Sequence, residues 1–371
     1  MKNFIPYLQI ELQFHDYKFA FFCFITAFIA TLFMIPPIIS LTRRYKLYDK
    51  PNARKEHSSP VPTMGGIAIA GGMTLALLLW FPFTADPQQV CFFFSVTIFL
   101  GLGIMDDLKD LSARYKLMIQ IALAALIALS GIRITSFDGL FGINEISIFS
   151  QYALTIVAIV GITNAFNLID GIDGLAGGLG FMSLVTLGLF LTLSGDTTYA
   201  LVAFALAGGV LAFLYFNFNP AKIFMGDTGS LVLGFVIAVL CIRLLQINVQ
   251  SVKPVLPHAP VFILGIVLIP VFDALRVFAF RIWKGKSPFT ADKTHIHHLL
   301  TSNGFSHVFA VRVICFLHAL ILLEVYLLRG MKPEFMLLGL AVFMILATVT
   351  LRFSKIFFSK PNLDNSYTIQ D

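Results

Sequence analysis

Long apolar runs separated by short polar segments occupy most of the chain. A helix that crosses a membrane needs roughly 17–25 mostly apolar residues, and eleven runs reach or approach that length. These runs are 19–41, 64–83, 90–105, 117–132, 146–163, 175–193, 199–218, 230–248, 259–280, 308–328 and 335–351. The pattern predicts an all-α polytopic membrane protein with ten or eleven transmembrane helices.

Composition supports the same fold class. Of the 371 residues, 58% are hydrophobic and 12% are charged, whereas about 25% of the residues in a soluble domain are charged. The mean hydropathy is +0.86. The four cysteines, Cys23, Cys91, Cys241 and Cys315, lie in apolar runs without the close paired spacing of metal sites or redox dithiols. We therefore expect buried free thiols in a membrane protein.

Lysine and arginine residues are distributed unequally between the two sets of loops. If the N-terminus is outside, 17 of the 26 lie in inside loops and 6 lie outside. Because inside loops carry the positive excess, this predicts an outside N-terminus and a cytoplasmic C-terminus. We expect one integral membrane domain over 1–354 and a short cytoplasmic tail over 355–371. The formal net charge of +6 reflects this topological bias, so we expect no nucleic-acid partner.

The dense polar motifs all lie in loops predicted to be inside. They include "MDDLKDLSARYKL" at 105–117, "NAFNLIDGIDGLAGG" at 164–178 and "NFNPAKIFMGDTGS" at 217–230. The orientation was inferred from Lys and Arg, whereas these motifs are rich in Asp and Asn, so two independent features agree. The sequence therefore predicts a polar site on the cytoplasmic face, at the ends of the spans.

Five carboxylates contribute to this predicted site: Asp106, Asp107, Asp170, Asp173 and Asp227. Like charges repel one another, so the cluster needs nearby lysines or a hard divalent cation to offset it. Mg²⁺, with Mn²⁺ as an alternative, fits oxygen ligands and leaves positions for substrate phosphates. Zinc is disfavoured because the histidines come without cysteine partners.

Each motif also has a simpler structural interpretation. Asp106 and Asp107 resemble a solvated helix end, and Asp227 resembles a cap of the following helix. Gly171 and Gly174 make "NLIDGIDG" compatible with an ordinary helix-terminating turn, although glycines also let a backbone approach a ligand closely. Only the combination of these motifs on one face favours a site.

Two basic inside loops carry further candidate ligands. His295, His297 and His298 lie close together in "ADKTHIHHLL", which suggests contacts with phosphate or substrate. Lys55 and His57 lie in "RKEHSSPVPTMGG". The alternative for this second loop is that its cations only hold the first two spans in orientation.

Taken together, the motifs resemble the polyprenyl-phosphate N-acetylhexosamine-1-phosphate transferase family. The matching segments are "RKEHSSPVPTMGG", "GIMDDLKDLSARYKL", "NAFNLIDGIDGLAGG", "FNFNPAKIFMGDTGS" and "PVFDALRVFAFRIWKGKSPFTADKTHIHHLL", within 54–300. The resemblance implies that undecaprenyl phosphate attacks the β-phosphorus of a UDP-sugar, giving undecaprenyl-diphosphate-sugar and UMP. "HIHH" resembles the branch that transfers N-acetylglucosamine 1-phosphate in the first membrane step of O-antigen, enterobacterial common antigen or teichoic acid linkage synthesis.

The resemblance also implies roles for individual residues. The catalytic set would be Asp106, Asp107, Asp170, Asp173, His297 and His298; Lys55, His57, Lys116, Asn167 and His295 would contact the substrates; and Asp227, Asp173 and Asn167 would be metal ligands. The acidic pair has two open roles, as a general base or as an organiser of the metal and lysines. A phosphate monoester with a second pKa near about 6 is already mostly dianionic at pH 7, which weakens the need for a base.

The implied setting is the bacterial cytoplasmic (inner) membrane, with the active site facing the cytoplasm. Expected partners are UDP-N-acetylglucosamine, undecaprenyl phosphate and the bilayer, with a homodimer left open. One alternative is the same reaction with another UDP-N-acetylhexosamine. Another is a non-catalytic membrane scaffold. A cation-coupled transporter is the alternative from another class, but it predicts acids near span centres. Only Asp273, expected to pair with Arg276, comes close to such a position.

Overall fold

The computed structural model describes residues 5–45, 48–49, 61–252, 254–285 and 295–358, and these residues are almost entirely helical. The α-helices are α1 (Ile5–Arg44), α2 (Gly65–Trp80), α3 (Pro87–Lys109), α4 (Ala113–Ser130), α5 (Ile148–Ile169), α6 (Leu175–Leu193), α7 (Thr197–Asn217), α8 (Gly226–Gln250), α9 (Ala259–Trp283), α10 (Ile296–Thr301), α11 (His307–Leu327) and α12 (Pro333–Phe358). A short 3₁₀ helix, η1, covers Leu140–Gly142. Two-residue strands β1 (Tyr48–Asp49) and β2 (Val61–Pro62) pair antiparallel. The predicted all-α class is confirmed.

Each of the eleven predicted runs falls on one helix. Among the described residues, ten helices are long and apolar enough to cross a membrane, and α2, with 16 residues, is a shorter apolar helix. The polytopic membrane class is therefore confirmed, whereas the exact number of spans and their orientation remain predictions. The division at residue 354 also remains a prediction, and 359–371 lies outside the described residues.

Two helix boundaries differ from the predicted ones in a way that concerns the site. Helix α3 continues through Lys109, so Asp106 and Asp107 lie in its last turn. Helix α8 begins at Gly226, so Asp227 lies inside its first turn and not before it. These aspartates lie within the helices, because their side chains contact partners in neighbouring elements.

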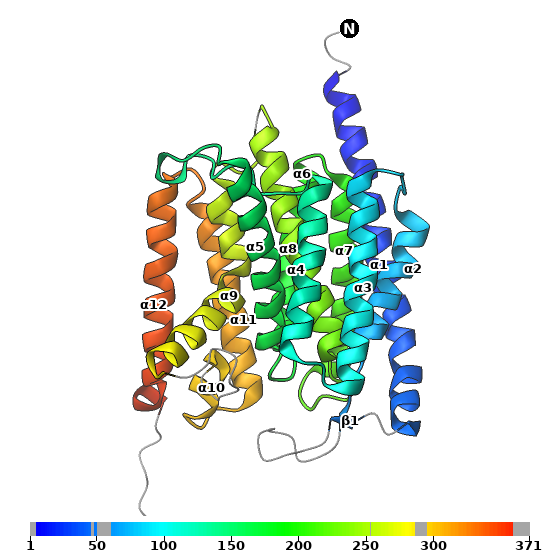
Figure 1. Ribbon diagram of the computed structural model, residues 1–371, viewed down its shortest axis with the longest axis vertical. Coiled ribbons are helices and arrows are strands. Elements are labelled where there is room, and N and C mark those ends of the chain that lie inside the picture. The colour runs from blue at the N-terminus through cyan, green and yellow to red at the C-terminus, as the bar shows by residue number, and fades with distance from the viewer. Residues whose placement is uncertain (1–4, 46–47, 50–60, 253, 286–294, 359–371) are drawn as a thin grey trace, which may run out of the picture.

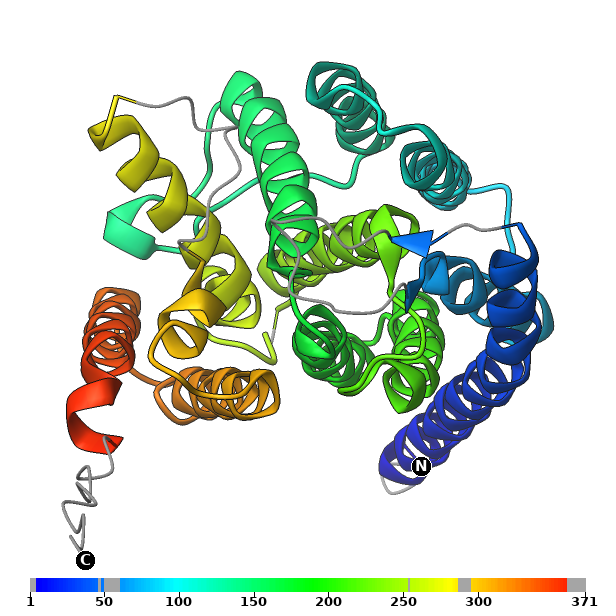
Figure 2. The ribbon, with the colours of Figure 1, turned by 90° about the horizontal axis from the view of Figure 1, so that it is seen from below.

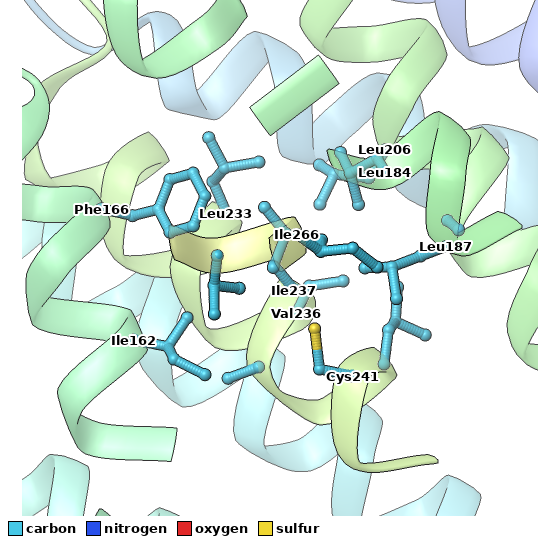
Figure 3. Close-up of a cluster of buried hydrophobic side chains, with 14 of the residues drawn as sticks. Ile162, Phe166, Leu184, Leu187, Leu206, Leu233, Val236, Ile237, Cys241 and Ile266 are labelled. Atoms are coloured by element: carbon cyan, nitrogen blue, oxygen red, sulfur yellow. The ribbon is translucent and has the colours of Figure 1, made fainter. Parts of the chain in front are cut away.

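Helix α8 forms the centre of the bundle and packs against α3, α5, α2 and α6 (Figure 2). It is apolar on all sides, as expected for a helix surrounded by protein. Its side chains Leu233, Val236, Ile237 and Cys241 meet residues of α5, α6, α7 and α9 in the buried cluster of Figure 3. The central position places the first turn of α8 between several neighbouring helix ends.

Small residues let α2 and α3 approach the first turn of α8. A Cβ built on Gly66 of α2 would lie 2.1 Å from the Gly229 backbone nitrogen, and one on Gly103 of α3 would lie 2.4 Å from the Thr228 Cα. Close approach through glycine is typical of helix packing in membranes. These contacts fix α8 against α2 and α3 at the end of the bundle where Asp227 lies.

All three acidic motifs meet at one end of the bundle (lower end in Figure 1). The C-terminal ends of α3, α5 and α7 and the N-terminal ends of α4, α6 and α8 lie there, together with α10. The predicted gathering of polar motifs at one face is therefore confirmed.

Candidate active site

The N-terminus of α8 is held by a carboxylate from α3. Asp107 Oδ1 accepts a hydrogen bond from the Asp227 backbone nitrogen at 2.8 Å, and Oδ2 accepts from the Thr228 backbone nitrogen at 3.1 Å and from its hydroxyl at 2.5 Å. The first backbone N–H groups of a helix have no partner within the helix, and a negative charge there is favourable. Both oxygens of Asp107 are thus occupied in positioning the turn that carries Asp227.

A lysine joins the other acid of the pair to Asp227. Lys116 Nζ in α4 lies 2.5 Å from Asp106 Oδ2 and 3.0 Å from Asp227 Oδ2. Asp106 is 6% exposed, and its second oxygen accepts from the Leu111 backbone nitrogen at 2.7 Å. Asn167 Nδ2 in α5 donates to Asp227 Oδ1 at 2.9 Å. Four helices therefore converge on Asp227, whose side chain remains 31% exposed.

Asp170 lies directly after α5 and faces the same acidic group. Burial, followed by the negative charges of Asp227, Asp107 and Asp173, raises the pKa of the Asp170 carboxyl to about 7. Within the described part of the chain, no hydrogen bond offsets its charge. A carboxyl group whose pKa is raised in this way, by burial and by like-charged neighbours, is typical of functional sites.

Asp173 binds the loop between α7 and α8. Its Oδ2 accepts from Asn219 Nδ2 at 3.2 Å and from the Ala221 backbone nitrogen at 3.0 Å. The Gly174 backbone nitrogen beside it donates to Asn217 Oδ1 at 2.7 Å. The "NLIDGIDG" turn and the loop between α7 and α8 are therefore bound to each other. This loop leads directly into the N-terminus of α8.

The histidines of the last loop occupy different environments. His295 Nδ1 lies 2.8 Å from Asp273 Oδ2, which is buried in the second half of α9. His297 is 2% exposed and packs against Gly171, and burial with the neighbouring His298 and His295 lowers the pKa of its imidazole to about 3. The His298 ring lies 4.2 Å from the His297 ring. His297 is consequently neutral throughout the physiological pH range.

The structure thus joins several predicted site residues by direct contact and places others nearby. Asp106, Lys116, Asn167 and Asp227 contact one another, and Asp107 binds the backbone of the same turn. Asp170 lies within their electrostatic reach, and His297 packs against the next residue, Gly171. Lys55 and His57 lie outside the described residues. The individual catalytic, substrate and metal roles remain predictions.

For Asp273, the sequence predicts only an ion pair with Arg276. That pair is present at 2.9 Å, but Asp273 also holds His295 and the Ile296 backbone nitrogen. The available signal was an acid inside an apolar run, which in a membrane protein marks a functional position by default. Thr228 and Asn219 also went unnoticed, because nothing local indicates which carboxylate they meet.

The donor set fits magnesium. Among the described residues, no group of three or more His, Cys, Asp or Glu side chains is placed to hold a metal. Mg²⁺ needs fewer protein ligands, since it keeps waters and is held by one or two carboxylates together with substrate phosphates. Asp227, which is partly exposed, and Asp170, whose charge is not offset, provide two such carboxylates. Asn167 lies beside Asp227, whereas the Oδ2 of Asp173 is occupied by the loop.

The fold and the site together define a class: a polytopic helical membrane protein with an acid-rich site at the span ends. The glycosyl transferase family 4 model matches residues 89–245. A probable undecaprenyl-phosphate N-acetylglucosaminyl 1-phosphate transferase of Bacillus subtilis is 35% identical over 78% of this chain and 80% of its own length. The undecaprenyl-phosphate alpha-N-acetylglucosaminyl 1-phosphate transferase of Haemophilus influenzae is 36% identical over 82% of this chain and 86% of its own length. The Escherichia coli protein of the same name is 31% identical over 72% of each chain. The protein belongs to glycosyl transferase family 4.

Proposed function

We propose that this transferase moves N-acetylglucosamine 1-phosphate from UDP-N-acetylglucosamine to undecaprenyl phosphate. The products are undecaprenyl-diphosphate-N-acetylglucosamine and UMP. The names of the three relatives support both the sugar and the lipid. The observation that carries the proposal is the meeting of Asp106, Lys116, Asn167 and Asp227 at one end of the spans.

The location of this site suits the two substrates. A long prenyl chain stays in the bilayer because of its large apolar surface, and a nucleotide sugar stays in water because of its charge. Their reacting phosphates therefore meet at the membrane interface. We place the site at the cytoplasmic face of the bacterial cytoplasmic membrane, because most Lys and Arg residues flank the same ends of the helices.

The side chains have separable tasks in this reaction. Asp107 holds the first turn of α8, so that Asp227 faces the interface. Asp106 holds Lys116, whose ammonium group offsets the negative charge of phosphate oxygens. Asp227 and Asp170 would hold Mg²⁺, which when bound supplies further electrostatic stabilisation of the transferred phosphoryl group.

No general base is needed from the acidic pair. The attacking phosphate is mostly dianionic at neutral pH, since the second pKa of a phosphate monoester is about 6. Asp106 already contacts a lysine ammonium group, and both oxygens of Asp107 already accept hydrogen bonds. We therefore assign both residues to positioning. The position of the acids at span ends also disfavours a cation-coupled transporter.

Transfer of radiolabel from UDP-N-acetylglucosamine to undecaprenyl phosphate by purified protein tests the proposal. We expect Mg²⁺-dependent lipid labelling that Asp227→Asn abolishes and Asp86→Asn retains, because Asp86 is exposed and lies at the opposite end of α3. Absence of labelling by folded wild-type protein would reject this donor. Labelling with another UDP-N-acetylhexosamine in its place would keep the reaction and change the sugar.

A further inference from the structure

Asp273 anchors the segment that carries the histidines. Its side chain is 1% exposed and accepts three hydrogen bonds, from His295 Nδ1 at 2.8 Å, the Ile296 backbone nitrogen at 2.8 Å and Arg276 Nη2 at 2.9 Å. A buried carboxylate is tolerated when its oxygens are hydrogen-bonded to charged or polar groups in this way. Two of the three donors belong to the start of α10, so Asp273 fixes where α10 begins.

The His295 ring lies beside the His297 ring, so the position of His295 influences where the His297 ring can lie. The two rings lie 5.9 Å apart and are nearly parallel, with an interplanar angle of 4°. His297 is 2% exposed, and its Nδ1 is buried with no hydrogen-bond partner within the described residues. Since nothing polar holds that nitrogen, packing alone determines where the His297 ring lies.

The Cε1–Nε2 edge of the His297 ring meets Gly171, directly after Asp170. A Cβ built on Gly171 would lie 2.9 Å from His297 Cε1 and 3.1 Å from its Nε2, and the three nearest atoms all belong to His297. The backbone of Gly171 is not in the left-handed region, so its conformation would accept an alanine. What excludes a side chain at position 171 is therefore the imidazole and not the turn.

We propose that Asp273 and Gly171 are positioning residues that hold the His297 imidazole against the turn carrying Asp170. Asp273 acts from the α9 side through His295, and Gly171 acts from the α5 side by leaving the space that the ring occupies. The last loop is thereby joined to the acidic site. The catalytic consequence rests on the proposed transferase function, whereas the placement of the ring does not.

Two substitutions disturb this contact from opposite sides. Asp273→Asn weakens the hold on His295, and Gly171→Ala pushes the ring away with a methyl group. Removing the outer-shell partner of a metal-ligating histidine costs about 10–100-fold in metal affinity or activity, and by analogy we expect a loss of kcat/KM of that order from either variant. Asp196→Asn is the matched control for Asp273→Asn, because Asp196 is also buried and ion-paired, to Arg243 at 2.7 Å. Gly161→Ala on α5 matches Gly171→Ala, because no heavy atom lies within 4 Å of its added methyl.

A double-mutant cycle separates this contact from general damage to the turn. In a His297→Ala background, the space beside Gly171 is open, so adding Gly171→Ala should lower kcat/KM no further. The same fold loss from Gly171→Ala in both backgrounds would overturn the proposal, because the methyl group would then act on the turn itself.

The placement of the ring has a readout that does not need activity. Carbethoxylation of His297 by diethyl pyrocarbonate, located by peptide mass spectrometry, should be slow in the wild type and in both controls, and several-fold faster in Asp273→Asn and Gly171→Ala. Equal protection in all five proteins would overturn the proposal. If the wild type transfers no sugar phosphate, the proposed function fails, and the modification rates still decide whether the two residues hold the ring.

Discussion

Replacing Asp170 by asparagine should stabilise the protein in the absence of magnesium. The pKa of the Asp170 carboxyl is raised from its ordinary value of 3.8 to about 7, first by burial and then by the charges of Asp227, Asp107 and Asp173. Each pKa unit corresponds to about 1.4 kcal/mol, so the ionised group opposes folding by at most about 4 kcal/mol. Because the side chain keeps some contact with water, we expect a gain of roughly 2–4 kcal/mol from Asp170→Asn at pH 8.

The gain should depend on pH in a defined direction. A carboxyl group whose pKa is raised in the folded state binds more protons when folded, so it contributes stability at low pH and loses that stability as the pH rises through about 7. Asparagine does not titrate. The advantage of Asp170→Asn over the wild type should therefore be largest above pH 7 and shrink as the pH falls toward 4.

Thermal unfolding in detergent with EDTA, followed between pH 5 and pH 8, measures this effect. We expect a higher Tm for Asp170→Asn at pH 8, and a larger Mg²⁺-induced rise in Tm for the wild type than for the variant, since the proposed Mg²⁺ site includes the charge that the variant lacks. Asp107→Asn should instead lower the Tm in the same assay, because the carboxylate of Asp107 accepts three hydrogen bonds. A lower Tm for Asp170→Asn at pH 8, or a gain that does not change with pH, would refute the reasoning.

Three further predictions concern residues around α8. Asp107→Asn should destabilise the protein by about 2 kcal/mol through weaker binding of the helix N-terminus, seen as a lower Tm. Gly66→Ala should lower the Tm, because its methyl group would meet the Gly229 backbone at 2.1 Å, whereas Gly101→Ala, with nothing within 4 Å, should not. Lys116→Met should reduce kcat at saturating Mg²⁺ and leave two carboxylates without their shared lysine; unchanged kcat would contradict its role at the phosphates.

The membrane class and the gathering of the acidic motifs at one end of the bundle were accessible from the chain alone. A span of about 20 apolar residues and a charged loop are local features, and each can be recognised without knowing its neighbours. The helix ends were less predictable. Asp227 lies inside α8 because Asp107, 120 residues earlier in the chain, accepts hydrogen bonds from its first turn, and no local pattern contains that contact.

The sequence by itself determined that five carboxylates and three histidines face the same side of a helical membrane protein. Tertiary structure decided what each acid does. Asp107 and Asp173 hold backbone segments, Asp106 and Asp227 share a lysine, and Asp170 has no hydrogen bond within the described residues to offset its charge. The physical reason is that a carboxylate's role depends on which donors reach it. In this protein, those donors come from helices and loops brought together by the packing around α8.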